Sequence, residues 1–469
     1  MRINLLKPKV KLQAKPVPSL KRKAAKMGGL LLGVNLALIL VTADMGDSSL
    51  HPANLLGTSS ESTQEVKLLA PNKDLILSDY KDLIGEDFHI PEGLKDRVGF
   101  WFDVYTKYDN NNRIIHHSLY PWIVFKVVDV TEIINAEEPR VRWLRNVKAD
   151  KFVASEMAAF RKALTHLSRG KAVDTSNEYQ VAVEKSLSLL PGTLKQNARK
   201  ALREVRVQTG QRNFFAEGLE VSPLYLKGME EIFRNNKLPV ELTRLPFVES
   251  SFNKHAKSKV GASGLWQFMD STGRKFMIVQ EHIDERTSPF KATEAAARLL
   301  KENHMILKRS WPLALTAWNH GPSGLRRAMK KAGSHDLTDI ISKGRSANFD
   351  FASSNFYSEF LAALFAERYH DEMFENLDYE KELDLHTVKL ARSVGAKELL
   401  RLSGLTKEDF LLFNPDLKRA VDRNASVPRG FTLMLDDGAR TVLKNLLSKE
   451  SLRTSAVKEK LSEADIVAL

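Results

Sequence analysis

Residues 238–252 read LPVELTRLPFVESSF, and a second stretch with specific polar residues follows at 258–269. A carboxylate, Glu249, follows Leu245, Phe247 and Val248 and precedes two serines. A carboxyl group held against apolar surface has its ionised form desolvated, which raises its pKa. Such a group is protonated at neutral pH and can act as a general acid and then as a base. On this stretch alone, a helix-terminal glutamate that points to water remains the simpler interpretation.

Three further stretches carry specific polar and aromatic residues. Residues 258–269 read SKVGASGLWQFM, in which the glycines let the backbone turn tightly and approach a ligand closely. Residues 311–321 read WPLALTAWNHG, which places Trp318 on an apolar helical face just before the end of the helix. Residues 355–365 read NFYSEFLAALF, where Tyr357 shares a helical face with apolar residues. Taken singly, each stretch fits an ordinary turn or buried helix.

Together and in this order, these stretches resemble the four motifs of the lytic transglycosylases of the goose-type lysozyme-like superfamily. The match is closest to the membrane-bound lytic murein transglycosylase D group. The motifs map onto Glu249-Ser250, Gly264-Leu265-Trp266-Gln267, Ala317-Trp318-Asn319 and Tyr357. The resemblance is specific over residues 237–370 and looser over 85–236.

Two features depart from the family's pattern. The third motif usually carries Tyr where this chain has Trp318, so any hydrogen bond made by the phenol hydroxyl is put in doubt. The lipid-bearing cysteine of the group is also missing, because the chain contains no Cys. Anchoring through a lipid on cysteine therefore does not carry over to this chain.

The resemblance implies a reaction and a role for each motif residue. The family cleaves the β-1,4 bond between N-acetylmuramic acid and N-acetylglucosamine, and its lone Glu, here Glu249, protonates the glycosidic oxygen. The same Glu then takes the proton of the muramyl C6 hydroxyl, which attacks C1 and closes a 1,6-anhydro ring without water. The implied substrate-binding residues are Ser258, Trp266, Gln267, Met269, Trp318, Asn319 and Tyr357. Ser250 either contacts substrate or bonds a backbone group where its helix ends.

No cofactor follows from the resemblance. His255 and His320 do not stand in the spacing of metal ligands, so we expect no metal site. The implied partner is the glycan strand of peptidoglycan, and the sequence identifies no protein partner.

We expect a mainly α fold in which a lysozyme-like helical catalytic domain is preceded by a largely helical N-terminal domain. A small α+β segment that resembles a LysM-type module follows. The predicted parts are a signal peptide or membrane anchor at 1–43, a linker at 44–75, the N-terminal domain at 76–236, the catalytic domain at 237–372, the LysM-like segment at 373–437 and a charged helical tail at 438–469.

Hydrophobic periodicity predicts individual elements at both ends of the body. In the N-terminal domain we expect helices over 93–108 and 151–167 and a strand over 119–130. In the LysM-like segment we expect strands over 379–383 and 432–435 and helices over 387–393 and 397–402. A last helix over 439–447 leads into the charged tail. We interpret Trp101, Trp122 and Trp143 as packing residues. Whether the LysM-like segment binds glycan or only packs on the catalytic domain stays open.

The 469 residues carry a net charge of +13, which raises the question of nucleic-acid binding. Nine Lys or Arg and no acid lie in residues 1–43, so only four of these net charges belong to the remainder. A nucleic-acid partner is therefore not expected. Residues 27–43 read MGGLLLGVNLALILVTA, an apolar run after a basic lead, as in an export signal or an uncleaved anchor. We expect an exported protein in the periplasm or cell envelope, held in the cytoplasmic membrane if the segment is uncleaved.

The sequence leaves two alternative functions open. A lysozyme-like hydrolase would use water and a second carboxylate, for which Asp270, Asp284 and Glu285 are candidates by position. A non-catalytic cell-wall-binding scaffold on the same fold is favoured by one motif change, Trp318. The family's other motif residues are intact, which favours the lyase.

Overall fold

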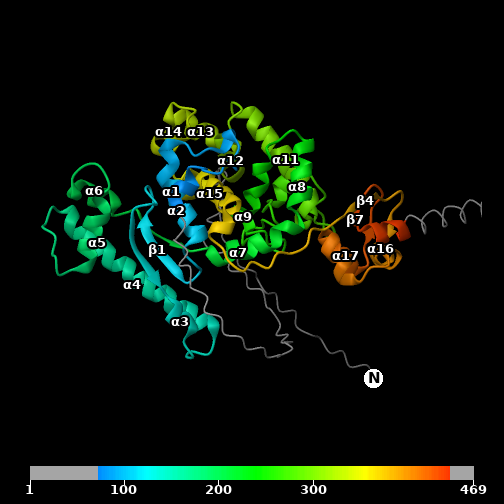
Figure 1. Ribbon diagram of the computed structural model, residues 1–469, viewed down its shortest axis with the longest axis horizontal. Coiled ribbons are helices and arrows are strands. Elements are labelled where there is room, and N and C mark those ends of the chain that lie inside the picture. Colours follow the sequence, from blue (N-terminus) through cyan, green and yellow to red (C-terminus); the bar gives the residue numbers. More distant parts are fainter. Residues whose placement is uncertain (1–71, 444–469) are drawn as a thin grey trace, which may run out of the picture.

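The computed structural model describes residues 72–443, in which the helices are longer and more numerous than the strands (Figure 1). The prediction of a mainly α protein is confirmed. The predicted signal or anchor at 1–43, the predicted linker (44–75) up to residue 71, and the tail beyond residue 443 lie outside the described residues. The last residues of the predicted linker belong to a helix that begins at Lys73.

The first half of the described chain combines helices with one small sheet. Its elements are α1 (Lys73–Leu77), α2 (Lys95–Thr106), β1 (Asn112–His117), β2 (Val124–Asp129), α3 (Thr131–Asn135), α4 (Arg142–Ser168), α5 (Glu178–Leu187), α6 (Leu194–Ala201), β3 (Val205–Thr209), α7 (Arg212–Val221) and α8 (Leu226–Asn235).

The central part is entirely helical between its loops. Its elements are α9 (Leu245–Ser250), α10 (Asp270–Gly273), α11 (Pro289–Ile306), α12 (Trp311–His320), α13 (Pro322–Ala332), α14 (Leu337–Lys343) and α15 (Phe351–Arg368). Helix α15 is buried on nearly every side, because apolar residues occur all around the helix and not on one face alone. It packs against α2, α9 and α12, so it is the axis around which the candidate site is built.

One hydrophobic core joins the first and central parts of the chain. It runs from Ile76 through Ile114 and again from Phe215 to Phe374. Residues on either side of the predicted boundary at 236 and 237 therefore share this core, and Phe233 and Leu238 both belong to it.

The sheet is antiparallel, with strand order β2-β1-β3. The strand predicted over 119–130 is confirmed only in its second half, as β2. Strands β1 and β3 were not predicted. In β1 the polar residues His116 and His117 are themselves buried, so the sequence NRIIHH lacks the alternation that marks a strand. Burial lowers the pKa of His116 to about 3, so this side chain is neutral inside the fold.

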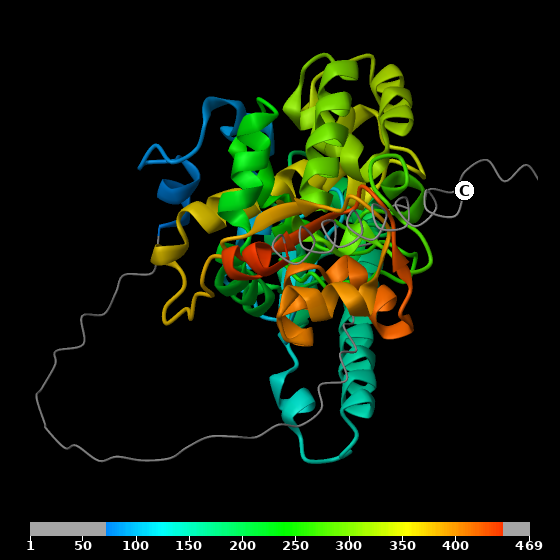
Figure 2. The same ribbon diagram turned by 90° about the vertical axis from the view of Figure 1, so that its right-hand side faces the viewer.

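A second core lies between α4, α5, α6 and the outer face of β2, and forms an arm beside the main body (Figures 1 and 2). The predicted helix over 151–167 is confirmed within α4, and Phe160 and Leu164 are buried there. Phe152 of the same helix is exposed. Trp101 is buried in the core, whereas Trp143 is 67% exposed and lies on the surface.

A small α+β unit ends the described chain. Its elements are β4 (His386–Lys389), β5 (Val394–Gly395), α16 (Ala396–Ser403), α17 (Lys407–Phe413), α18 (Lys418–Arg423), β6 (Ser426–Val427) and β7 (Thr432–Leu435). The predicted helix at 397–402 and strand at 432–435 are confirmed. The strand predicted at 379–383 and the helix predicted at 387–393 are wrong: β4 occupies 386–389 and pairs antiparallel with β7. Helical residues at 437–443 agree with the start of the last predicted helix.

This unit is docked on the central part by a buried cation. Lys291 on α11 forms ion pairs with Glu285 (3.1 Å) and Asp416 (2.7 Å). Its ammonium group also lies 3.5 Å from the ring centroid of Phe431. Ile283 completes the unit's own hydrophobic core. The interface is therefore both charged and apolar, and the unit packs on the central part. Of the helices in residues 72–443, none is long and apolar enough to cross a bilayer.

Candidate active site

Glu249 lies near the end of α9, a short helix whose residues are all buried. Ser251 (φ +49°) and Phe252 (φ +57°) turn left-handed and end the helix directly after this site. Ser250 donates from its hydroxyl to the carbonyl of Leu265 (2.8 Å), which ties the end of the helix to the loop before α10. The backbone-bonding role considered for Ser250 is therefore the one the structure shows.

A buried ion-pair network fixes the start of α9. The Arg244 guanidinium, directly before the helix, donates to both carboxylate oxygens of Glu367 on α15 (3.0 and 3.1 Å). It also pairs with Glu230 on α8. Burial alone would raise the pKa of Glu367, but the Arg244 charge holds it below its usual value. Three helices are thereby locked around the backbone that carries Glu249.

The Glu249 carboxyl group is 6% exposed, and burial raises its pKa to about 8. The hydrogen bond from Trp318 opposes this rise, because it stabilises the ionised form. Glu249 is consequently protonated at neutral pH and within reach of ionisation slightly above it. These are the properties that a group needs to donate and then recover a proton.

Trp318, near the end of α12, lacks the phenol hydroxyl of the family's usual Tyr, but its side chain still donates a hydrogen bond to Glu249. Its indole Nε1 donates to Oε1 of Glu249 at 2.8 Å. The ring meets Phe268 edge-on, with centroids 5.2 Å apart. Indole N–H is a donor only, so Trp318 stabilises the carboxylate without competing for its proton.

Gly264 positions the second motif against the loop that holds Arg286. Its φ is +79°, and a Cβ there would lie 1.9 Å from the carbonyl oxygen of Arg286. The Arg286 guanidinium in turn donates to the carbonyls of Gly261 (2.9 Å) and Phe268 (3.2 Å). A glycine is therefore required at 264 for both backbone conformation and space.

Ser258 and Gln267 stabilise this same loop. The Ser258 hydroxyl accepts from the backbone N–H of Ala262 (2.9 Å). The Gln267 side-chain amide donates to the carbonyls of Gly264 (2.8 Å) and Ala256 (3.2 Å), and its φ is +46°. The amide nitrogen is thus occupied, while the amide oxygen of Gln267 makes no hydrogen bond within residues 72–443.

Trp266 does not lie where a groove-lining residue would. It is fully buried, stacks on Phe233 with centroids 5.9 Å apart, and donates from Nε1 to the hydroxyl of Thr293 (2.9 Å). Its ring touches Trp318, so it supports the site from the core side. Met269, predicted beside it, is partly exposed at the start of α10.

Asn319 and Tyr357 come from α12 and α15. Oδ1 of Asn319 accepts from the hydroxyl of Ser353 on α15 (3.2 Å), which links the two helices next to Trp318. Tyr357 is 2% exposed, and burial raises the pKa of its phenol well above the usual value. The structure records no hydrogen bond between Tyr357 and Glu249, although α15 packs against α9.

Sequence reasoning missed a second buried carboxyl group, Glu359 on α15. Burial raises its pKa to about 8, with a further contribution from the Glu249 charge and an opposing one from Arg206. Burial also raises the pKa of Tyr105 well above its usual value, and the charges of Glu359 and Glu249 both add to this rise. The three groups therefore form one buried electrostatic cluster. A lone acid within the run FYSEFLAALF was the signal available in the sequence.

The three carboxylates considered for a hydrolase have other partners. Asp270 pairs with Arg274 (2.6 Å) on the surface, and Asp284 pairs with Arg286 (2.8 Å). Glu285 pairs with Lys291 and accepts from the backbone N–H of Ile278 (2.7 Å). In the described part of the chain, no three His, Asp or Glu side chains are grouped as metal ligands would be.

Comparison with known proteins points to one family. Residues 230–341 match the family model "Transglycosylase SLT domain". Over 98 residues the chain is 34% identical to the membrane-bound lytic murein transglycosylase D of Escherichia coli strain K12. This match covers 21% of the chain and 22% of the relative, so the chain spans about a fifth of that protein's length.

Two further similarities are more limited. A putative tributyltin chloride resistance protein of Alteromonas sp. is 33% identical over 100 residues, which is 21% of this chain and 48% of that protein. The 70 kDa soluble lytic transglycosylase of Escherichia coli aligns in structure with a TM-score of 0.28 and 15% identity, over 53% of this chain and 40% of that one. The family match encloses Glu249, Gln267 and Trp318. Residues 230–341 are therefore similar to the transglycosylase SLT domain, and the chain resembles a lytic murein transglycosylase over about a fifth of its length.

Proposed function

We propose that the chain is a peptidoglycan lytic transglycosylase that cleaves the MurNAc-β-1,4-GlcNAc bond and leaves 1,6-anhydro-MurNAc ends. The observation that carries the proposal is the environment of Glu249. One buried carboxyl group with its pKa raised to about 8 meets a donor-only partner, the Trp318 indole. This arrangement suits a group that gives up a proton and takes one back.

The reaction proceeds in two proton transfers through Glu249. Protonated Glu249 gives its proton to the glycosidic oxygen as the bond from C1 breaks, which releases the GlcNAc hydroxyl. The resulting carboxylate is stabilised by the Trp318 N–H at 2.8 Å. It then takes the proton of the muramyl C6 hydroxyl, whose oxygen bonds to C1 and closes the anhydro ring. Glu249 is thereby restored to its protonated form, and no water is consumed.

The neighbouring residues act on binding and position. The Gln267 amide oxygen would accept a hydrogen bond from the substrate's N-acetyl group, since its amide nitrogen is bound to the loop. Asn319 has its Oδ1 bound to Ser353, which leaves its amide N–H groups to donate to sugar hydroxyls. Ser258 and Met269 would border the substrate from the same loop, and Tyr357 would act from α15. Trp266 acts only through Trp318, because it is buried.

A water-using hydrolase fits this site less well. Glycosidases with two carboxylates need one of them ionised, as nucleophile or as base. Glu359 is near enough to interact with Glu249, but burial raises its own pKa to about 8, so it is protonated at neutral pH.

We propose the cell envelope as the site of action, with residues 27–43 as export signal or anchor and glycan strands as substrate. Binding of glycan by residues 373–437 remains a prediction. The test is incubation of the full chain with purified peptidoglycan, followed by mass spectrometry of the soluble products. Anhydro-muropeptides support the proposal, and reducing-end muropeptides, heavier by one water, contradict it. Sacculi that are bound but not cleaved would favour the scaffold.

A further inference from the structure

Helix α4 forms the long edge of the arm and presents one face that no other element covers (Figures 1 and 2). Its buried face packs against α5, α6 and β3. The opposite face is a stripe at helical spacing in which each residue follows the last by three or four positions. The stripe consists of Leu144, Lys148, Lys151, Ser155, Ala158, Lys162, Thr165 and Arg169.

The stripe is cationic along its length. Within residues 72–443, Lys148, Lys151, Lys162 and Arg169 make no ion pair. The same helix holds two acids, and neither belongs to the stripe: Glu156 pairs with Lys126 (2.7 Å), and Asp150 acts on the charge of Arg113 in β1. The positive charge of the stripe is thus left uncompensated by its own helix.

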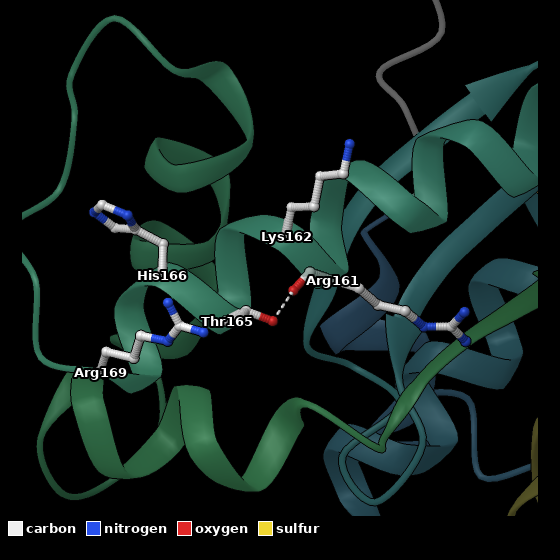
Figure 3. Close-up of a pocket in the computed structure, with 5 residues that line it drawn as sticks. All are labelled: Arg161, Lys162, Thr165, His166 and Arg169. Carbon is white, nitrogen blue, oxygen red and sulfur yellow. Dashed lines mark hydrogen bonds between the residues drawn. The ribbon is translucent and has the colours of Figure 1, made fainter.

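The far end of the stripe widens into a basic hollow. Figure 3 shows Lys162, His166 and Arg169 there, together with Arg161 and Thr165. The Thr165 hydroxyl donates to the Arg161 carbonyl (2.7 Å). The hollow is therefore lined by three cationic side chains, one imidazole and this satisfied hydroxyl. An anionic ligand is the complementary partner for such a surface.

The near end of the stripe carries apolar side chains that face water. Trp143 is 67% exposed, and Val141 and Leu144 beside it are exposed as well. Arg142 and Arg145 are interleaved with them. Two exposed acids, Glu137 and Glu138, precede this segment, and Glu138 is near Arg140 (3.5 Å). Three apolar side chains are too small a patch for a stable protein interface, which buries at least about 1,000 Å².

We propose that this face of α4, from the apolar tip at Val141, Trp143 and Leu144 along the cationic stripe to Arg169, lies against the anionic headgroups of a phospholipid membrane. Helices that bind at the boundary between headgroups and acyl chains combine Trp and Leu with neighbouring Lys and Arg. The tip enters that boundary, while Lys148, Lys151, Lys162 and Arg169 pair with lipid phosphates. The proposed partner is a lipid surface. Until this point, membrane contact had been predicted only for residues 1–43.

The length of the chain before the structure is compatible with this placement. The apolar run predicted as export signal or anchor ends at residue 43, and the described structure begins at residue 72. Even fully extended, the intervening 28 residues reach about 100 Å at most. An uncleaved anchor would therefore hold the arm within reach of the membrane. The proposal does not depend on the catalytic activity.

The experiment uses the full chain and its lack of cysteine. A single cysteine at Val141→Cys is labelled with an environment-sensitive fluorophore, and Met305→Cys, 59% exposed on α11, is the matched control. Both proteins are mixed with vesicles of phosphatidylglycerol and phosphatidylcholine in equal parts, and with vesicles of phosphatidylcholine alone. A label at a fixed site reports contact of the arm even where residues 27–43 insert.

The expected result is a blue shift and quenching by brominated lipid at position 141 with anionic vesicles, and neither at position 305. High salt and the pair Lys148→Glu and Lys151→Glu should remove the response, since screening and charge reversal both weaken the attraction. The proposal is overturned by an unchanged label at 141, or by an equal response to neutral vesicles. A response to protein concentration without lipid would indicate a second copy instead, and a response to sacculi alone would indicate a cell-wall polymer.

Discussion

The indole Nε1 of Trp318 donates a 2.8 Å hydrogen bond to Oε1 of Glu249. This contact joins α9 to α12 at the point where the chain departs from its family's usual tyrosine. Burial raises the pKa of Glu249 to about 8, and the hydrogen bond from Trp318 opposes this rise.

Trp318→Phe should lower kcat by about 10- to 100-fold, because a hydrogen bond to a charged group contributes about 1.5–3 kcal/mol. Removal of the donor also raises the pKa of Glu249. A general acid is active while protonated, so activity falls as pH rises through that pKa, and the alkaline limb of the kcat profile should move to higher pH. Trp318→Tyr, which keeps a donor, should lie closer to the original. Identical pH profiles for the original and the Phe variant would show that the contact has no role.

Glu249→Gln should lower turnover at least about 10³-fold, since the same group serves both proton transfers. Binding to sacculi should persist, because amide and carboxyl are alike in shape. Glu294→Gln, an exposed glutamate paired with Arg298 on α11, is the control and should retain full activity. Product release is measured by mass spectrometry, and pelleting with sacculi measures binding. Full turnover in Glu249→Gln is the outcome that rules out this residue.

Glu359→Gln should stabilise the fold at alkaline pH. The pKa of Glu359 is raised from 4.5 to about 8, so the folded state holds a proton that the unfolded state has already lost. Stability from this group is complete below pH 4.5 and declines as pH rises to about 8. Because one pKa unit corresponds to about 1.4 kcal/mol, the variant should gain at least about 1 kcal/mol at pH 9 over pH 5. Denaturant unfolding at both pH values measures this, and an equal difference at both would contradict it.

Gly264→Ala should destabilise the loop that carries Gln267, by roughly 2–4 kcal/mol, through strained φ and overlap with backbone. The new Cβ would lie 1.9 Å from the Arg286 carbonyl oxygen, and neither backbone can yield without moving the loop. Gly261→Ala is the control, since its φ is +93° but nothing lies within 4 Å of its Cβ. Thermal unfolding temperature and kcat are measured for both variants. Gly261→Ala reports backbone strain alone, whereas Gly264→Ala reports strain together with steric overlap. Equal losses in both would mean that the close approach of Arg286 is unimportant.

Arg244→Ala should cost about 3–5 kcal/mol, because it leaves the Glu367 carboxylate buried without its partner. Arg234→Ala removes an exposed arginine from the same Glu230 and should cost about 0.5 kcal/mol or less. Urea unfolding compares the two. A small loss for Arg244→Ala would mean that the buried network does not anchor α9.

Many helices of the fold were predictable, because hydrophobic periodicity is a local property. The motif residues were predicted through their resemblance to a known family. Helix α16 and strand β7 follow directly from their apolar patterns. Strand β1 was missed because its buried His116 and His117 look polar, and they are neutral only once the sheet encloses them. Strand β4 was taken for a helix because four residues are too short to separate the two periods.

Contacts across the chain could not be read from the sequence. Glu249 and Trp318 are 69 residues apart, and their hydrogen bond exists only when α9 and α12 pack together. The same holds for Glu359, whose relation to Glu249 depends on the packing of α15. Trp266 illustrates the reverse case: its motif implies substrate, while packing against Phe233 buries it completely.

The most direct test of the account is cleavage of purified peptidoglycan by the full chain in oxygen-18 water, with mass spectrometry of the muramyl ends. If Glu249 passes the proton of the C6 hydroxyl and water takes no part, the products are one water lighter than reducing ends and carry no oxygen-18. Reducing muramyl ends that carry oxygen-18 at C1 would contradict the account and place the protein among the hydrolases.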